Sequence, residues 1–487
     1  MGLIQVAGIS ETFGQEAYIL DQVLEPGLPT SDQFAWGMDT DGDRLLISDP
    51  MASPGSQFNA GALHAYRWDA QSSIWASDGY ITALSPSPGS RFGWFHAIGQ
   101  DKVVASERSD CTGACPLLVF QRTGDNSWPY LGQLVQPASV NGGTFGSSIS
   151  MSGELVAVGG GRIDERECVL IYDLSGGLQP IRTILEPIQD MGSVQLFGSA
   201  LDLQDEVLLI GAPGDAELGM DAGAAYVHRR DLGGNDEWGL VKKVLPSDGS
   251  TGDRFGFSLR TRDGLAAVSA IRKVVSDSTA GQVYVLGRDH GGVENWGELD
   301  AILPPAPRNN MEFGRSLEIS GVTILVGTPK DLSGKGSVHI HTMTGQHTWS
   351  LAQVIEGNEP FERFGNSVRT GGLGFVAAAP WNNAQDFNTG MARSYRLSPA
   401  GVVSLDVSGM HVFPNPFTTN FRLIGIPEGA SSMEIYDAQG QLVRAIRLHE
   451  RSVTCEVPWP EGSTGVYSAL IRDRSGQWLV RMKLIAQ

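Results

Sequence analysis

The most constraining feature of this chain is a Phe-Gly phrase that recurs along most of its length. In chain order the phrase is anchored at Phe34, Phe92, Phe145, Phe197, Phe255, Phe313 and Phe364. Successive anchors lie 51 to 58 residues apart, and all but Phe34 are followed directly by glycine. A period near fifty residues is typical of propeller and solenoid arrays, so the seven anchors predict seven structural units.

Each unit carries four short apolar runs after its anchor, separated by turns rich in glycine and polar residues. Examples are 207–210 for a second run, 281–285 for a third, and 238–245 for a fourth that begins at tryptophan. Such runs predict a four-stranded antiparallel meander. A sheet that is apolar on both faces must stack against neighbours, and closing the stack into a ring leaves no exposed end. We therefore predict an all-β chain, with a seven-bladed β-propeller over residues 1–405 and the anchor phenylalanines packed between its sheets.

The two ends of the repeat array complement each other. The seventh unit has a third run at 391–395 but no convincing fourth run, whereas the chain begins with an isolated fourth run at 18–24. We therefore expect an N-terminal strand, at about residues 17–25, to complete the last blade and close the ring.

A different domain follows the repeats, over residues 406–487. It opens at Val412–Phe417, where two prolines fix an extended backbone and forbid regular strand pairing. Short alternating runs then continue to the last residues, in a pattern of seven strands. Seven short strands in a segment of this size predict a small Ig-like β-sandwich.

Charge and hydropathy narrow the classes of partner. The net charge of −19 and the isoelectric point near 4.9 argue against nucleic acid and anionic membranes as partners. No apolar run is long enough to span a membrane, so no transmembrane segment is predicted. The first residues lack the basic segment of a signal peptide, so we expect that a signal has been removed or that the native start lies elsewhere.

The four cysteines give little information about the redox compartment. Cys111 and Cys115 enclose only three residues, within a loop between a second and a third run. A local disulfide and two free thiols are both open there, and the spacing without further cysteines or histidines does not predict a zinc site.

The units resemble FG-GAP repeats. Both phrases of that family survive in one unit, as Phe197-Gly198 and Gly211-Ala212-Pro213, and the resemblance covers about residues 15 to 400. It implies a seven-bladed propeller of the kind found in integrin α-subunit heads and bacterial surface proteins. Such domains mostly bind partners and do not usually catalyse reactions.

Calcium is a candidate ligand in the first unit, because some FG-GAP repeats hold calcium between their first two strands. Asp39, Asp41 and Asp43 stand at alternate positions in that turn. The later acid that the pattern requires falls at Ile47, and a metal-free Asp-Gly hairpin turn explains the same residues.

The C-terminal domain resembles the type A sorting domain of the type IX secretion system. The matching phrases are Pro414-Asn415-Pro416, Ile435-Tyr436-Asp437 leading to Gly440, Gly465-Val466-Tyr467 and Lys483-Leu484-Ile485. The resemblance implies export by the type IX machinery through residues 411–487, and a protein secreted from, or attached to, a Bacteroidota-type cell. An Ig-like carbohydrate-binding or spacer module is the alternative.

No sequence motif nominates a catalytic residue. The chain has no Gly-x-Ser-x-Gly elbow, no His-Glu-x-x-His and no sialidase box. His339 and His341 share one face of a strand and could bind a metal, but His339 occupies a position where other units place a packed tyrosine.

The long loops between second and third runs hold the candidate binding residues. One loop contains Asp215, Glu217 and Asp221, and another contains Trp381 and Phe387, whose rings could also fold back over a blade. We therefore expect a binding or adhesion propeller that recognises a protein or a glycan. One alternative is a secreted enzyme that acts on polysaccharide in the central channel, and another is an adhesin stiffened by calcium.

Overall fold

The computed structural model describes residues 17–27, 33–108, 115–187, 194–345, 347–383 and 389–398, and a set of strands between residues 411 and 486. The chain divides into two compact units. One spans Tyr18–Leu397, and the other includes Ser398–Gln487.

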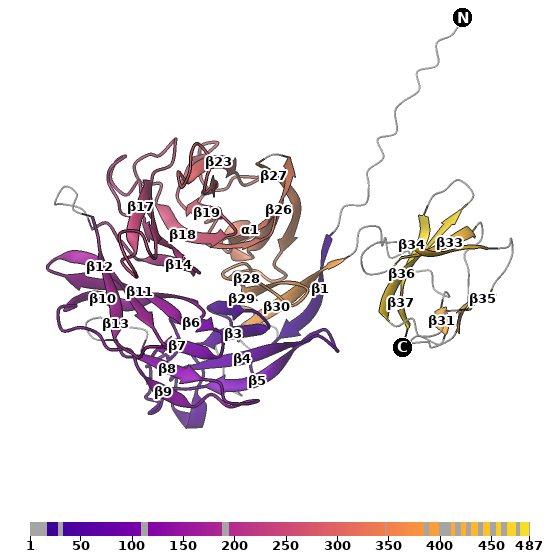
Figure 1. Ribbon diagram of the computed structural model, residues 1–487, viewed down its shortest axis with the longest axis horizontal. Helices are drawn as coiled ribbons and strands as arrows, with labels where there is room; N and C mark the ends of the chain where they lie inside the picture. The colour runs from indigo at the N-terminus through magenta and orange to yellow at the C-terminus, as the bar shows by residue number, and fades with distance from the viewer. Residues whose placement is uncertain are drawn as a thin grey trace, which may run out of the picture. The chain divides into compact units, whose positions relative to one another are not determined.

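The first unit contains seven four-stranded antiparallel sheets, shown in Figure 1. The first three sheets are β2 (Met38–Asp41), β3 (Arg44–Asp49), β4 (Ala62–Asp69) and β5 (Ile74–Ile81); β6 (His96–Gly99), β7 (Lys102–Ser106), β8 (Leu117–Gln121) and β9 (Tyr130–Gln133); and β10 (Gly142–Ser152), β11 (Leu155–Ile163), β12 (Arg166–Asp173) and β13 (Pro180–Leu185). The next three are β14 (Ala200–Gln204), β15 (Val207–Ala212), β16 (Ala224–Arg229) and β17 (Gly239–Val244); β18 (Phe255–Arg262), β19 (Leu265–Ala270), β22 (Gln282–Gly287) and β23 (Gly297–Ile302); and β24 (Ser316–Ser320), β25 (Thr323–Thr328), β26 (Ser337–Gly345) and β27 (Thr348–Glu356). The seventh is β28 (Val368–Gly371), β29 (Gly374–Ala379), β30 (Met391–Ser398) and β1 (Ala17–Leu24).

The first strands of the seven sheets surround one axis. Each of them, from β2 through β6, β10, β14, β18 and β24 to β28, neighbours the next, and β28 neighbours β2 again. The sheets are therefore the blades of a closed ring, and the prediction of an all-β seven-bladed propeller is confirmed. Short elements decorate the loops: a β20 (Val274–Val275) and β21 (Ser278–Thr279) ribbon, a 3-10 turn at Pro54–Ser56 and a helical turn α1 (Asp331–Gly334).

The anchor phenylalanines fill the space between neighbouring blades. All seven are at most 1% exposed. Phe255 belongs to a core cluster that combines Leu209 and Val227 of the fourth blade with Tyr284 of its own blade, which its ring meets edge-on at 5.2 Å. In β15 every residue after the first is buried, as expected for a strand that is packed on both faces.

At five of the seven junctions, a glycine before the third strand lets the following anchor approach. Gly223 has a φ of +89°, forms an isolated parallel bridge to Phe255, and would place a Cβ only 2.1 Å from the Phe255 carbonyl oxygen. No side chain fits there, and the left-handed φ favours glycine. Corresponding glycines at other junctions are Gly61, Gly281, Gly336 and Gly390.

The N-terminal strand β1 lies beside β30 as the outer strand of the seventh blade, where Figure 1 shows an indigo strand against an orange one. Two glutamine side chains connect it to the neighbouring blades. The Gln353 amide pairs with the backbone N–H and C=O of Tyr18 at 2.7 and 2.9 Å, and the Gln22 amide pairs with those of Trp75 at 2.8 and 3.0 Å. Each side-chain amide therefore makes, across the junction between two blades, the pair of hydrogen bonds that a backbone residue of a neighbouring strand would make.

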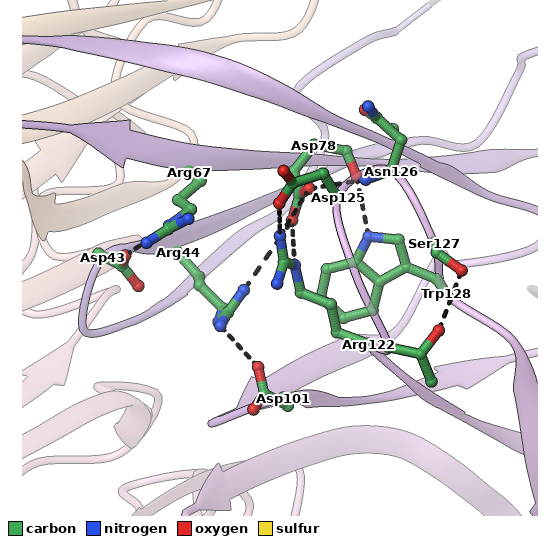
Figure 2. A network of polar contacts seen from close by, with 12 residues as sticks. Asp43, Arg44, Arg67, Asp78, Asp101, Arg122, Asp125, Asn126, Ser127 and Trp128 are labelled. Carbon is green, nitrogen blue, oxygen red and sulfur yellow. Dashed lines mark hydrogen bonds and ion pairs between the residues drawn. The ribbon is translucent and has the colours of Figure 1, made fainter. Parts of the chain in front are cut away.

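An ion-pair cluster joins the first two blades on their outer side, shown in Figure 2. Arg122 donates to both carboxylate oxygens of Asp78, at 2.6 and 3.2 Å, and the Asn126 N–H donates to the same carboxylate at 2.9 Å. Burial alone would raise the pKa of Asp78, but these hydrogen bonds outweigh it and the pKa is lowered. Trp128 adds an indole N–H bond to the Asp78 backbone carbonyl. The cluster therefore fastens one blade to the next.

The second unit contains two antiparallel sheets. One has the order β31 (His411–Phe413), β32 (Asn420–Ile424), β35 (Thr454–Pro458), and the other has the order β34 (Leu442–Arg447), β33 (Ala430–Tyr436), β36 (Gly465–Asp473), β37 (Trp478–Ala486). Its Ig-like topology stays a prediction. Among the described residues of the whole chain, no helix is long and apolar enough to cross a membrane.

Candidate functional site

Two cavities open along the axis of the propeller. One, of about 620 Å³, is bordered by the turns between the first two strands of the blades, and we call it the turn-face mouth. The other, of about 460 Å³, is bordered by the starts of the innermost strands and by the long loops, and we call it the loop-face mouth. The two share His96, Ile149, Leu201, Arg260 and Arg369 in their walls, so together they form a channel with a common middle.

Charged side chains at one position of the repeat lie at this common middle and on its turn-face side. Five residues after each anchor stand Asp39, Ala97, Ser150, Asp202, Arg260, Glu318 and Arg369, which we call the belt. Equivalent positions of seven blades converge on the axis of a propeller, so residues about fifty apart in sequence become neighbours.

The charges of the belt are paired. Arg260 donates to Asp202 at 2.7 Å and lies 3.5 Å from the Glu318 carboxylate, so it bridges two blades. Burial alone would lower the pKa of Arg260, but the carboxylates of Asp202 and Glu318 outweigh it and raise that pKa. Burial raises the pKa of Glu318, and Arg260 and Arg369 oppose the rise. Removing one partner of such a buried pair leaves an uncompensated charge, so the three side chains depend on one another.

Asp39 and His96 complete the middle of the channel. Asp39 accepts from Arg369 at 3.3 Å and from the Ile98 N–H at 3.0 Å. Burial lowers the pKa of His96 to about 4, against the opposing effects of Asp39 and of the Gly93 carbonyl, which lies 3.0 Å from Nδ1. His96 is therefore neutral at pH 7, and its enclosed Nε2 has no hydrogen-bond partner in the described structure.

The turn-face mouth is rich in carboxylates. Its walls hold Asp39, Asp41, Glu154, Asp173, Asp202, Asp205, Glu206 and Glu318, together with four arginines, among the described residues. Serine hydroxyls tie its innermost strands together: Ser150 accepts from the Leu203 N–H at 2.9 Å, and Ser152 accepts from the Asp205 N–H at 3.0 Å. This end of the channel is therefore acidic, and hydrogen bonds from serine hydroxyls to backbone N–H groups connect its innermost strands.

The loop-face mouth carries aromatic side chains and arginines. The position two residues after each anchor supplies Trp36, Trp94, Ser199, Phe257, Arg315 and Asn366 to its walls. The Trp36 and Trp94 rings lie 4.7 Å apart at an angle of 40°. The guanidinium of Arg315 lies over Phe257 at 5.2 Å. Rings and guanidinium groups held in this way form a polar-aromatic surface.

Arginines that precede the anchors extend this surface. Arg91, Arg254 and Arg363 each stand directly before an anchor, with left-handed φ values of 58°, 58° and 55°. Arg91 lies over the Trp94 ring at 5.5 Å, and Arg254 lines the mouth itself. The backbone strain at this position is repeated around the ring, so it belongs to the repeat and not to one site.

The loop carboxylates predicted to contact a ligand have unlike surroundings. Asp215 is fully buried and accepts from the Tyr226 hydroxyl at 3.0 Å, the Glu217 N–H at 3.0 Å and the Lys243 ammonium at 2.7 Å. It therefore stabilises its own loop. Glu217 pairs with Lys243 at 2.7 Å, and Asp221 lies 3.4 Å from Arg254, next to the loop-face mouth. A ligand role for these three residues stays a prediction.

The two predicted aromatic anchors differ in what the structure describes. Trp381 is partly buried, and the Arg363 guanidinium lies 3.8 Å from its ring. Phe387 lies outside the described residues.

The three candidate calcium ligands point to different partners. Asp39 is engaged in the belt, Asp41 accepts from the Gln100 N–H, and Asp43 pairs with Arg67 at 2.9 Å. Within the described parts of the chain, no group of three or more acidic, histidine or cysteine side chains could hold a metal ion. The arrangement does not gather the six or more oxygens that calcium takes, and calcium at these residues stays an untested hypothesis.

The remaining histidine and cysteine candidates have structural surroundings. His339 is buried edge-on against Phe313 at 5.2 Å, and burial lowers the pKa of both His339 and His341 to about 4. Cys115 is disulfide-bonded, whereas Cys111 lies outside the described residues. Cys168 is a buried free thiol whose pKa burial raises to about 12.

Neither the belt nor the loop-face mouth was predicted from the sequence. An alignment of the seven units on their anchor phenylalanines contains the signal that would have predicted both. The column two positions after the anchor contains Trp36, Trp94, Phe257 and Arg315, and the column five positions after it contains the charged residues of the belt.

Two family models match the chain, one within the propeller and one over the C-terminal domain. A family model for the FG-GAP repeat matches residues 238–286, and a model for the secretion system C-terminal sorting domain matches residues 411–487. No curated protein matches the sequence.

Among solved structures, the WD40 domain of Toxoplasma gondii coronin is similar with a TM-score of 0.50 and 9% identity, over 79% of this chain and 87% of that one. A periplasmic gluconolactonase of Pseudomonas aeruginosa has a TM-score of 0.44 and 12% identity, over 66% and 85%. Sqt1 of Saccharomyces cerevisiae has a TM-score of 0.42 and 10% identity, over 98% and 100%. At such identities the likeness concerns the fold alone.

The sorting-domain match fixes where the protein acts, because such a domain directs a chain to the type IX secretion system. The protein is secreted from, or attached to the outer surface of, a Bacteroidota-type cell. The chain is a seven-bladed β-propeller that contains an FG-GAP repeat at residues 238–286, and it carries a secretion system C-terminal sorting domain at residues 411–487.

Proposed function

We propose that the propeller is a binding module that recognises an extracellular glycan or protein through its loop-face mouth. The observation that carries this proposal is the half-buried Trp36–Trp94 pair at the opening of the channel. Aromatic rings beside arginines at a concave opening are the side chains that most often anchor a ligand.

The state of the channel middle also supports binding over catalysis. A general acid or base needs a carboxyl or imidazole whose proton can reach a substrate. In the belt, Asp202 is held by Arg260 and by the Thr261 N–H, at 2.7 Å in each case, and Asp39 is held by Arg369 and a backbone N–H. These groups are therefore used to hold the blades together.

One observation favours the alternative of an enzyme that acts on polysaccharide. Glu318 is 1% exposed, lines the turn-face mouth and has a raised pKa, which is the state of many catalytic acids. The variant Glu318→Gln would remove such activity. Release of reducing sugar ends by the wild-type protein, lost in this variant, would establish the enzyme in place of the binding module.

The proposal is tested by binding of the full chain to an array of glycans. We expect selective, saturable binding that Trp94→Ala weakens by about tenfold, because a stacking contact is lost. Phe58→Ala is the matched control, since Phe58 is 71% exposed and does not line the mouth. Equal binding by both variants, or cleavage of the bound glycan, would contradict the proposal.

A further inference from the structure

The loop-face mouth has a charge opposite to that of the chain as a whole. Among the described residues its walls contain four arginines, Arg254, Arg260, Arg315 and Arg369, and no carboxylate, although the chain carries a net charge of −19. Arg260 and Arg369 are paired with belt carboxylates, so Arg254 and Arg315 supply the positive charge at the opening. A concave site lined by one sign of charge concentrates ligands of the opposite sign. The ligand that this end of the channel attracts is therefore an anion.

The arginines of the mouth retain donors for such an anion. Arg315 comes no closer than 4.0 Å to the Glu312 carboxylate, which itself pairs with Lys330 at 2.6 Å. Arg254 contacts Asp221 at 3.4 Å through one nitrogen. A guanidinium has five N–H donors in a planar fork that matches a carboxylate or a sulfate ester, so both side chains keep capacity for a ligand.

The rings beside these arginines suit a sugar. Trp36, Trp94 and Phe257 all line this mouth and are partly exposed, the two tryptophans from the first two blades and Phe257 from the fifth. The face of an aromatic ring is electron-rich, and the C–H groups on one face of a pyranose carry the complementary partial charge. A row of sugar rings can therefore stack here while its acidic substituents reach the guanidinium groups.

The main chain at the mouth disfavours a peptide ligand. Peptides commonly bind by adding a strand to free backbone groups. Here the Gly37, Phe95 and Ser258 N–H groups already donate to the hydroxyls of serines in the adjoining strands, Ser48, Ser106 and Ser269, at 2.8, 3.1 and 3.1 Å. Recognition therefore depends on side chains, which a glycan can satisfy with its hydroxyls and anionic groups.

We propose that the loop-face mouth binds an anionic glycan, with sugar rings on Trp36, Trp94 and Phe257 and with carboxylate or sulfate groups on Arg254 and Arg315. This inference rests on the proposed binding function and specifies the ligand class for the same site. Uronates and sulfate esters offer the same chemistry to a guanidinium, so the two sources are separated by experiment.

The test measures binding of the full chain to polygalacturonate, dextran sulfate and uncharged dextran by calorimetry at physiological salt. We expect one or both charged polymers to bind, and dextran to bind at least tenfold more weakly. Arg315→Gln and Arg254→Gln should each weaken charged-polymer binding by about tenfold to a hundredfold, because a charge-assisted hydrogen bond is lost. The polymer that binds identifies carboxylate or sulfate as the preferred group.

Matched variants make the result specific. Arg67→Gln removes an exposed arginine on the opposite face and should leave binding unchanged. Trp94→Phe keeps a ring and should bind better than Trp94→Ala, with melting temperatures confirming that both are folded. If Arg67→Gln weakens binding as much as Arg315→Gln does, the polymer responds to the overall charge of the protein and not to the loop-face mouth. That result would overturn the inference.

Three further outcomes separate the result for this inference from the result for the proposed function. If dextran binds as well as the charged polymers and only Trp94→Ala weakens binding, the binding function holds and the anionic ligand is wrong. If a charged polymer is shortened during incubation, the ligand class holds and the protein is an enzyme. If none of the three polymers binds, the anionic-glycan inference is rejected.

Discussion

The two ends of the channel belong to the same ring but differ in chemistry. Among the described residues, the turn-face mouth holds eight carboxylates and four arginines, whereas the loop-face mouth holds four arginines, two tryptophans and no carboxylate. Both ends are built from equivalent positions of the repeat. The repeat therefore fixes the geometry through its phenylalanines and glycines, while the positions between them are free to differ from blade to blade.

The largest expected effect is a loss of stability when the belt, which lies between the two mouths, loses one of its arginines. Arg260→Met should lower the free energy of unfolding by about 3–5 kcal/mol, because it leaves the buried carboxylates of Asp202 and Glu318 without their partner. Urea unfolding followed by tryptophan fluorescence measures this loss.

Two companion variants identify the cause. Arg67→Met removes an exposed ion pair and should change the stability little. Adding Asp202→Asn and Glu318→Gln to Arg260→Met should restore part of the lost stability, because the uncompensated charges are gone. A single Arg260→Met variant as stable as the wild type would mean that the belt does not hold the blades together.

The next effect is a pH dependence that originates at His96. Its folded pKa of about 4 lies below the unfolded value of 6.5, so the unfolded chain takes up a proton first as the pH falls. The histidine therefore favours the folded state above pH 6.5, and this contribution, about 3 kcal/mol, is lost between pH 6.5 and 4. Asp39 and Arg369 face the ring and act in opposite directions.

Comparison with His96→Gln isolates this contribution. Above pH 7 the stability of the two proteins should differ by a constant amount, and below pH 6.5 the wild type should lose about 3 kcal/mol more than the variant. Chemical unfolding at a series of pH values provides the curves. Parallel curves down to pH 4 would show that the channel middle is open to water at His96.

The smallest effect is expected from calcium at the acidic end. Asp39, Asp41 and Asp43 already accept hydrogen bonds from three different partners, so about 10 mM calcium, well above the ~1 mM dissociation constant of weak extracellular sites, should leave the melting temperature unchanged. Thermal unfolding with calcium and with a chelator checks this. A calcium-dependent rise that Asp41→Asn abolishes would restore calcium as a ligand and change the view of the turn-face mouth.

The fold could be predicted from sequence because its cause is local and repeated. Each anchor phenylalanine fills the same space between two blades, and each unit has the same order of apolar runs. Seven copies of one signal outweigh the drift of any single copy, such as the Phe34 unit, where Ala35 replaces the glycine.

The site was harder to predict because its cause is not local. Trp36 and Trp94 are 58 residues apart, and only the packing of the first blade against the second brings their ring centroids to 4.7 Å. Asp215 shows a second difficulty: a carboxylate in a long, variable loop is a candidate for ligand contact, and in the structure it also accepts from Tyr226 and pairs with Lys243, while its ligand role stays a prediction. Loop position alone does not show whether a polar side chain faces a ligand or supports its own turn.

The most direct test of the difference between the two mouths is one titration performed on three proteins. Binding of the charged polymer that the wild type binds more tightly, polygalacturonate or dextran sulfate, is measured for the wild type, for Arg315→Gln at the loop-face mouth and for Asp205→Asn at the turn-face mouth. The account predicts at least tenfold weaker binding for Arg315→Gln and an unchanged dissociation constant for Asp205→Asn. If Asp205→Asn binds more weakly than the wild type and Arg315→Gln binds as tightly as the wild type, the account is contradicted and the ligand lies at the acidic end of the channel.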